Sequence, residues 1–156
     1  MQAFHADQFV LPLPEGHRFP MGKYERLRAR VVEHLPMLRL GQAQPASDGE
    51  LALAHTPRYV SAVAEGLLCD AEQREIGFPW SARMVERARR SVGATIQAAR
   101  AALLDGDGVA ANLAGGTHHA FPDHGEGFCV FNDVAVAVRA LQHRRRIARA
   151  AIVDLD

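Results

Sequence analysis

Residues 108–119, GVAANLAGGTHH, form the stretch that decides the fold. Their first seven residues are small and mostly apolar, which is typical of a strand, and two glycines end the run. A helix that begins at Asn132 or Asp133 and ends at Leu141 should follow. After it comes a second apolar run rich in β-branched residues, AAIVDL at 150–155. Strand, helix and strand in this order predict a right-handed βαβ unit of a parallel sheet.

The two predicted strands carry chemically active side chains at their carboxyl ends. His118 and His119 follow the first strand, and Asp154 and Asp156 stand at the end of the second. In parallel sheets, binding and catalytic residues gather at this edge. Imidazoles titrate near neutral pH and suit proton transfer or metal ligation. Because adjacent side chains point in different directions, we expect one histidine to act as a base and the other as its partner.

The two aspartates predict a metal ion. Residues two apart on a strand share a face, so Asp154 and Asp156 should point the same way. Carboxylates at the end of a buried strand are costly unless a cation or hydrogen bonds compensate, and zinc accepts both carboxylate and imidazole ligands. Each pattern alone also fits a simpler interpretation, in which the histidines are ordinary loop residues and the aspartates cap the next turn.

A cysteine lies in the loop that joins the two motifs. Cys129 belongs to the segment GEGFCVFND at 125–133. Its thiol could be a nucleophile, with His118 or His119 as the base. Its neighbours on both sides are large and apolar, however, and this favours a buried, unreactive thiol.

The chain before residue 108 should be mainly helical after a short strand at residues 2–5. The helix signals are an apolar spacing of three or four residues over 22–35, a Ser-x-x-Glu capping box at 47–50, a Thr-Pro start at 56–57 and an amphipathic pattern over 81–104. In the longest helix we expect Met84 and Val92 on the buried side and Arg87 among the solvated charges.

Composition excludes several classes of partner. Lysine plus arginine number 18 and aspartate plus glutamate number 18, so no charge imbalance indicates nucleic acid or a membrane surface as partner. Cys69 and Cys129 are too few for a disulfide framework. No apolar stretch approaches the roughly 20 residues of a membrane span. Residues 1–10 lack the pattern of a signal peptide. We therefore expect a reducing, cytoplasmic setting.

Three motifs, taken together, resemble the histone deacetylase family. They are GGTHHA at 115–120, GEGFCVFNDVA at 125–135 and VDLD at 153–156. Upstream, PEGHRFPM at 14–21 resembles the start of bacterial members, and HTPRYV at 55–60 is similar to another family segment. The resemblance covers essentially the whole chain. It implies a three-layer α/β fold, the arginase/deacetylase fold, with one parallel sheet between helices.

The resemblance also implies a metal-dependent hydrolase of acetyl-lysine-type amides. Asp156 would be a metal ligand and His119 the general base that activates a metal-bound water. His118, hydrogen-bonded to Asp154, would assist electrostatically. The metal would be Zn²⁺, with Fe²⁺ as the alternative, and Asp154 would also contribute to a K⁺ site. Zinc would polarise the amide carbonyl and lower the pKa of its bound water.

The same resemblance implies the nature of the substrate and the extent of the domain. Gly127 and Phe128 would line the channel that admits acetylated lysine or an acetylated polyamine. Residues 1–156 would be the N-terminal part of a single deacetylase domain, so that the fold is incomplete. The family's other two metal ligands and its oxyanion tyrosine have no counterparts here. We therefore expect the 156-residue chain alone to be inactive, to bind zinc weakly and to aggregate through its unpaired last strand.

Three alternatives remain open at this point. A ureohydrolase of the same fold would use paired manganese ions, and the sequence Thr117-His118-His119 argues against it. A metal-free, noncatalytic fragment could act only by association. A cysteine hydrolase that uses Cys129 is the third alternative.

Overall fold

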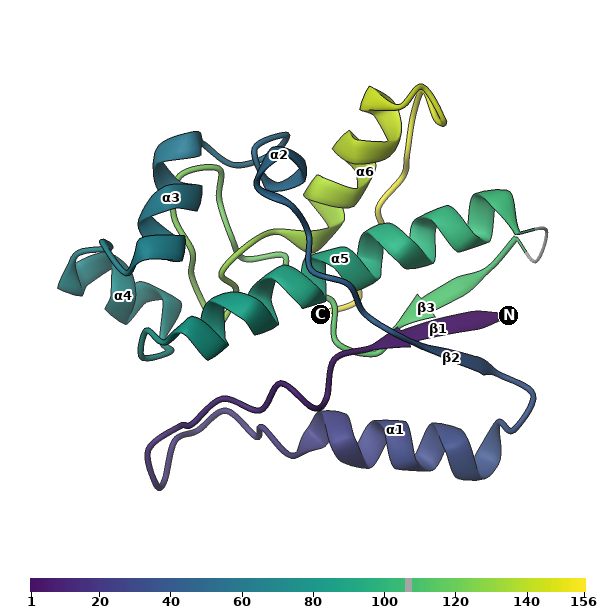
Figure 1. Cartoon of the computed structure of the whole chain (residues 1–156), viewed down its shortest axis with the longest axis horizontal. Helices are drawn as coiled ribbons and strands as arrows, with labels where there is room; N and C mark the ends of the chain where they lie inside the picture. Colours follow the sequence, from purple (N-terminus) through teal and green to yellow (C-terminus); the bar gives the residue numbers. More distant parts are fainter. Residues whose placement is uncertain (106–107) are drawn as a thin grey trace.

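A three-stranded parallel sheet forms the middle of the molecule in the computed structural model, which describes residues 1–105 and 108–156. The strands are β1 (Gln2–His5), β2 (Arg39–Gln42) and β3 (Ala110–Asn112), in the order β2-β1-β3 (Figure 1). Residue 2 of β1 pairs with residue 39 of β2 and with residue 110 of β3. The strand predicted at 2–5 is confirmed, and the one predicted at 108–114 is shortened to three residues.

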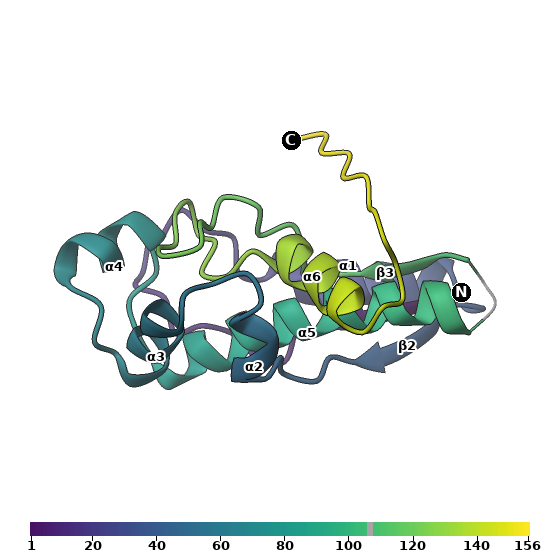
Figure 2. The same cartoon turned by 90° about the horizontal axis from the view of Figure 1, so that it is seen from above.

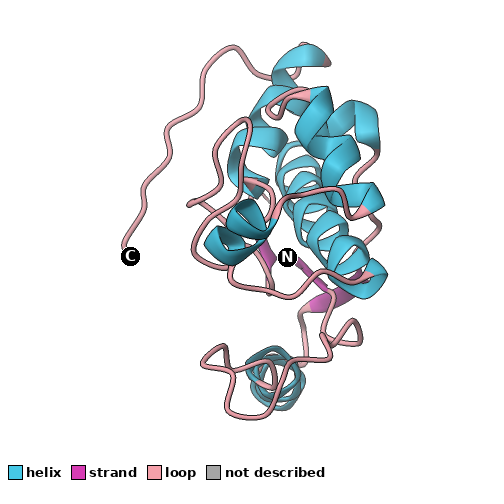
Figure 3. Cartoon of the chain, turned by 90° about the vertical axis from the view of Figure 1, so that its left-hand side faces the viewer, coloured by secondary structure: helices cyan, strands magenta, loops and turns pink. Residues whose placement is uncertain are grey.

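Helices lie on both sides of this sheet. They are α1 (Lys23–His34), α2 (Asp48–Leu51), α3 (Pro57–Glu65), α4 (Asp70–Ile76), α5 (Ala82–Leu104) and α6 (Asp133–His143). The long helix α5 contacts β1, β3 and α6, whereas α1 lies on the opposite side of the strands (Figure 1). Figure 3 shows α1 end-on, below the strands and apart from the other helices. The arrangement is the three-layer fold expected from the sequence.

Side-chain caps fix where four of these helices begin. Ser47 and Glu50 form the predicted reciprocal capping box at α2. Thr56, Ser81 and Asn132 each accept a hydrogen bond from a backbone N–H in the first turn of α3, α5 and α6. A cap of this kind contributes about 1 kcal/mol, and at α6 the structure selects Asn132 over Asp133 as the cap.

The apolar core lies against α5. Tyr59, Leu51, Val92, Val136 and Phe131 are almost fully buried there and join α2, α3, α5 and α6. A smaller cluster of mostly alanine side chains fills the space between α5 and β1. The predicted buried side of α5 is confirmed for Met84 and Val92.

The prediction that Arg87 is solvated is wrong. Only 8% of the residue is exposed, and its guanidinium lies 4.5 Å from the ring centre of Tyr24 and 6.0 Å from that of Phe19. The aliphatic stem packs like an apolar side chain, while the charged end lies over two aromatic faces that attract it. Helical periodicity places this position on the outer face of α5. Periodicity within one helix carries no information about the loop that folds over that face.

The helix predicted at 22–35 forms, but its apolar face remains open. No residue of α1 is buried, and Leu27 and Leu35 are exposed. An ion pair from Arg28 Nε to Asp7 Oδ2, 2.7 Å long, ties α1 to the segment that follows β1.

The strand predicted at 150–155 is wrong, and with it the βαβ unit. Residues 150–156 form an exposed tail that leaves α6 and extends away from the helices (Figure 2). Val153 and Leu155 are 83% and 94% exposed. A strand persists only where neighbours take up its backbone donors and acceptors, and no described strand lies beside this tail. The β-propensity of these residues is therefore not enough to form a strand.

Among the described residues, no helix combines the length and apolar character that a membrane crossing requires.

Candidate active site

The double histidine lies on a loop held against the N-terminus of α6. The loop leaves β3 and passes so close to α6 that a Cβ on Gly115 would lie 2.6 Å from an oxygen of Asp133. Only glycine permits that approach without displacing the carboxylate. The single hydroxyl proton of Thr117 is shared between the carbonyl oxygen of Phe131, 2.6 Å from Oγ1, and the carboxylate of Asp133, 2.8 Å away, which joins the loop to the start of α6.

The two imidazoles converge instead of pointing apart. The Nε2 atoms of His118 and His119 lie 3.2 Å apart, and their ring centroids are 4.2 Å apart. The expectation drawn from adjacent positions fails because this loop is not a regular strand. His119 is exposed, and His118 is partly buried.

Both predicted aspartates reach His118 although they are not on a strand. Asp154 Oδ2 lies 3.0 Å from Nδ1 of His118, and Asp156 Oδ2 lies 3.3 Å from Nε2 of the same ring. The backbone N–H of Asp156 donates to Asp154 Oδ1 at 3.1 Å, which curls the end of the tail toward the histidines. The carboxylates are thus drawn in by the imidazole and not by a buried strand.

A zinc ion fits the spacing of these groups. One ligand atom from each of His118, His119 and Asp156 lies within 4.8 Å of the others, so this group of described residues could hold a metal ion. Zinc–nitrogen bonds of about 2.0–2.1 Å place the ligand atoms of a tetrahedral site roughly 3.3 Å apart. The distances of 3.2 Å between the imidazoles and 3.3 Å from His118 to Asp156 match that spacing. Imidazole and carboxylate are also donors that zinc accepts.

Gly127 and Phe128 form a wall beside the histidines. Both have positive φ, at 56° and 67°, and a Cβ on Gly127 would lie 3.2 Å from Cδ2 of His119. A positive φ at a phenylalanine costs of order 1–3 kcal/mol. Backbone hydrogen bonds hold this turn, since the N–H groups of residues 127 and 128 donate to the carbonyls of Glu75 and Ile76 at the end of α4.

Phe128 is packed from two sides. Its ring centroid lies 5.2 Å from that of Phe19 and 5.1 Å from that of Phe78. The guanidinium of Arg18 lies 5.0 Å from the Phe128 ring centre. The strained turn is therefore fixed by aromatic packing as well as by hydrogen bonds.

An open pocket runs between this wall and the histidine loop. Its volume is about 800 Å³, including the space that opens to solvent at its mouth. All the predicted site residues except Asp154 line it: His118, His119, Gly127, Phe128 and Asp156. Phe19, Tyr24 and Arg87 complete its sides. One concave surface therefore holds titratable groups at one end and aromatic rings along its wall.

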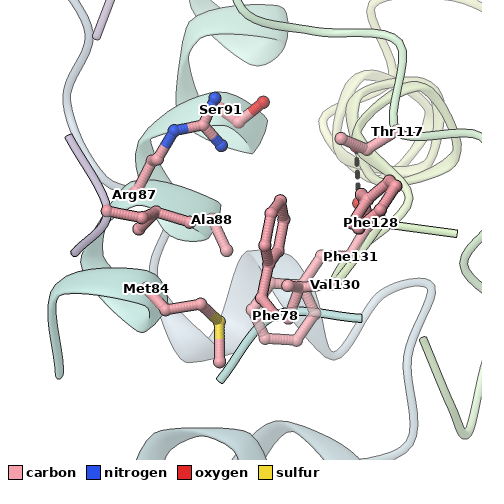
Figure 4. A pocket seen from close by; sticks show the side chains of 10 residues that line it. Phe78, Met84, Arg87, Ala88, Ser91, Thr117, Phe128, Val130 and Phe131 are labelled. Carbon is pink, nitrogen blue, oxygen red and sulfur yellow. Dashed lines mark hydrogen bonds between the residues drawn. The ribbon is translucent and has the colours of Figure 1, made fainter. Parts of the chain in front are cut away.

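A smaller pocket of about 280 Å³ lies behind Phe128 (Figure 4). Its walls are mostly apolar and include Phe78, Met84 and Phe131. Figure 4 shows the hydrogen bond from Thr117 to the Phe131 backbone along one side. The pocket contains no titratable pair and belongs to the packing that supports the loop.

The thiol of Cys129 is unsuited to nucleophilic attack. The residue is 5% exposed, and burial raises the pKa of its thiol. Its Sγ donates weakly to the carbonyl of Gly127 at 3.7 Å. A protonated, buried thiol is unreactive, which favours the inert interpretation.

Sequence reasoning missed His55. The residue is 3% exposed, and its Nε2 accepts a hydrogen bond from the backbone N–H of Asn132 at 3.0 Å. Burial lowers the pKa of this imidazole. The segment HTPRYV at 55–60 resembles a family segment, but nothing in its pattern shows that the histidine would reach a helix start 77 residues away.

Comparisons with known proteins identify relatives of this chain. The family model described as "Histone deacetylase domain" matches residues 17–156. An uncharacterized protein of Picosynechococcus sp. is 46% identical over 155 residues, which cover 98% of this chain and 51% of that protein. A "histone deacetylase-like amidohydrolase" of Pseudomonas aeruginosa is 34% identical over 76% of this chain and 32% of its own length.

A solved structure shows the same fold. The crystal structure of an HDAC homolog from Aquifex aeolicus superposes with a TM-score of 0.70 at 26% identity, over 92% of this chain and 41% of that one. The chain thus spans about half, or less, of the length of these relatives. With a matching family model over nearly its whole length and this shared arginase/deacetylase fold, the chain belongs to the histone deacetylase family.

Proposed function

We propose that this protein hydrolyses acetyl-lysine-type amides with the aid of zinc, and that residues 1–156 form the N-terminal part of a single deacetylase domain. One observation carries the proposal. The paired imidazoles of His118 and His119, joined by Asp156, converge within 4.8 Å at one end of an open pocket with an aromatic wall. Membership of the deacetylase family supports it.

His119 is assigned as the general base. Its imidazole is exposed, lines the pocket and lies next to Gly127. A water molecule in the pocket can therefore reach its ring nitrogen. His118 is assigned as the electrostatic partner. Asp154 accepts from Nδ1 of His118 at 3.0 Å and fixes the orientation of that ring. A base of this kind contributes typically 10²–10⁴-fold to the rate.

Asp156 is assigned as the protein's ligand to zinc. When bound, zinc polarises the amide carbonyl and lowers the pKa of its water. A K⁺ site at Asp154 and Fe²⁺ in place of Zn²⁺ remain predictions.

The pocket wall suits a substrate with a polar amide on an aliphatic chain. Phe128 and the neighbouring Phe19 present rings against which methylene groups can pack, and Gly127 leaves room beside His119. Acetylated lysine and acetylated polyamines share this chemistry.

The test is acetate release by the protein at the full length that its gene encodes, loaded with zinc and supplied with an N-acetyl-lysine peptide or with N-acetylspermidine. We expect turnover of at least one substrate and a loss of roughly 10²–10⁴-fold in the variant His119→Ala. The control is His34→Ala, because His34 lies on α1, outside the pocket, and forms an ion pair with neighbouring Glu33. Absence of acetate release from both substrates would refute the proposal. Full activity of His119→Ala would refute the assignment of the base.

A further inference from the structure

Asp133 is a buried carboxylate that binds the histidine loop. The residue is 1% exposed. It accepts hydrogen bonds from the backbone N–H groups of Gly116 and Thr117, at 3.2 and 2.8 Å, and from the hydroxyl of Thr117 at 2.8 Å. The hydroxyl of Thr95 on α5 donates to it at 2.5 Å. All four donors are neutral, and three of them belong to the loop just before the double histidine.

Asn132 binds the same loop on its other side. Its Nδ2 donates to the carbonyl oxygens of His118 and Ala120, both at 3.1 Å. Its Oδ1 accepts from the backbone N–H of Ala135 and so caps α6 at 3.0 Å. Both protons of the amide are therefore directed at the carbonyls on either side of His119.

These contacts exceed what a helix start requires. A cap needs only the bond from Ala135 to Asn132, whereas five further bonds from the two side chains run to residues 116–120. Thr95, which donates to Asp133, also accepts a hydrogen bond from Asn112 of β3 at 2.7 Å. The loop is thereby tied through α6 to α5 and to the sheet.

We propose that Asn132 and Asp133 are positioning residues of the active site, which set the backbone from which His118 and His119 project. The assignment of a catalytic consequence rests on the proposed function. Neither side chain lines the pocket, so both act through the loop. A misplacement of a catalytic group by about 1 Å can lower a rate by roughly 10²-fold, so loosening the loop should lower kcat more than it changes KM.

Two nearly isosteric variants separate positioning from stability. Asn132→Asp keeps an oxygen that caps α6, but it replaces the amide nitrogen, which carries both donors, with an acceptor oxygen that faces the carbonyls of His118 and Ala120. Asp133→Asn keeps the shape and turns one acceptor into a donor that faces the loop's own N–H groups. The matched control, Ser47→Ala, removes the cap of α2 and leaves the histidine loop untouched.

Each variant is compared with the wild type at full length and loaded with zinc. The measurements are kcat and KM for the N-acetyl-lysine peptide, the urea midpoint, and the ¹H–¹³C ring correlations of His119. We expect kcat to fall roughly 10–100-fold in Asn132→Asp and Asp133→Asn, with KM within about twofold and the His119 ring signals shifted. Ser47→Ala should lower the urea midpoint while leaving kcat and the ring signals at their wild-type values.

The outcomes are distinct. Unchanged ring signals and kcat in a folded Asn132→Asp variant would overturn the inference, and so would a loss of kcat that Ser47→Ala reproduces in proportion to its lost stability. If Asp133→Asn fails to fold, Asn132→Asp, which retains the cap, decides the matter alone. If the wild type hydrolyses no acetylated substrate, the proposed function fails, and the His119 ring signals still decide whether these residues position the loop.

Discussion

Gly93, in the middle of α5, offers a sharp test of how the fold is packed. A Cβ added there would lie 1.8 Å from the carbonyl oxygen of Gln44 and 3.1 Å from the backbone nitrogen of Ala46. Both contacts are with backbone, and that backbone is held: Ala46 N–H donates to Arg89 of the same helix at 2.9 Å. The variant Gly93→Ala therefore requires α5 and residues 44–46 to separate by roughly 1 Å or more.

Two effects of opposite sign compete in this variant. Alanine is favoured over glycine in a helix by about 0.8–1.0 kcal/mol, which would stabilise the protein. Overpacking typically costs 1–3 kcal/mol, and the contact with Gln44 places this case at the upper end or above it. We expect a net loss of about 2 kcal/mol, which corresponds to a fall in Tm of roughly 4–8 °C for a chain of this size.

The assay is thermal and urea unfolding followed by circular dichroism. The matched control is Gly49→Ala in α2, where an added Cβ meets nothing within 4 Å and only the helix preference should act. We expect that control to be as stable as the wild type or slightly more stable. A Gly93→Ala variant at least as stable as the wild type would show that α5 does not approach residues 44–46 this closely.

Two further predictions concern titration and metal binding. Burial lowers the pKa of His55 below the ordinary value for histidine of about 6.5, so the unfolded chain binds this proton more readily than the folded one. Stability should therefore be full above about pH 6.5 and fall as the pH drops below it. The urea midpoints at pH 7.5 and 5.5 should differ less in His55→Gln than in the wild type. Asp156→Asn should remove most bound zinc from the full-length protein, whereas Asp154→Asn should retain the zinc and lose roughly 10–100-fold in activity. Elemental analysis measures the bound zinc, and acetate release measures the activity. Loss of zinc from Asp154→Asn would contradict the role of Asp154 as a partner of His118.

Local signals predicted much of the fold. The capping box at Ser47, the Thr56-Pro57 start and the apolar spacing of α5 depend on residues within a few positions of one another, so the sequence contains all the information they need. The tail at 150–156 shows the opposite case. Its composition is that of a strand, but strand formation depends on neighbours that composition cannot supply.

The candidate site, like the fold, was predictable from the sequence only in part. The residue types at His118, His119 and Asp156 indicated metal or acid–base chemistry, and the structure brings them together. Their supports were not foreseeable from spacing. The sequence predicted Asn132 only as a helix cap. Its bonds to the loop carbonyls connect residues 12 and 14 positions apart through a turn without periodicity, and no sequence pattern indicates such contacts.

Because the two imidazoles converge, His119 could act either as a zinc ligand or as the general base. The two roles exclude each other at the same ring nitrogen. A carboxylate can only accept, so the proton between His118 and Asp154 resides on Nδ1 of His118. The Nε2 atom of that ring faces Nε2 of His119 and the carboxylate of Asp156. An imidazole whose Nε2 binds zinc has no lone pair left on that atom to accept a proton from water, so His119 cannot be ligand and base through the same atom. Zinc content in His119→Ala separates the cases: retention of the metal with lost turnover supports the base, and loss of both makes His119 a ligand.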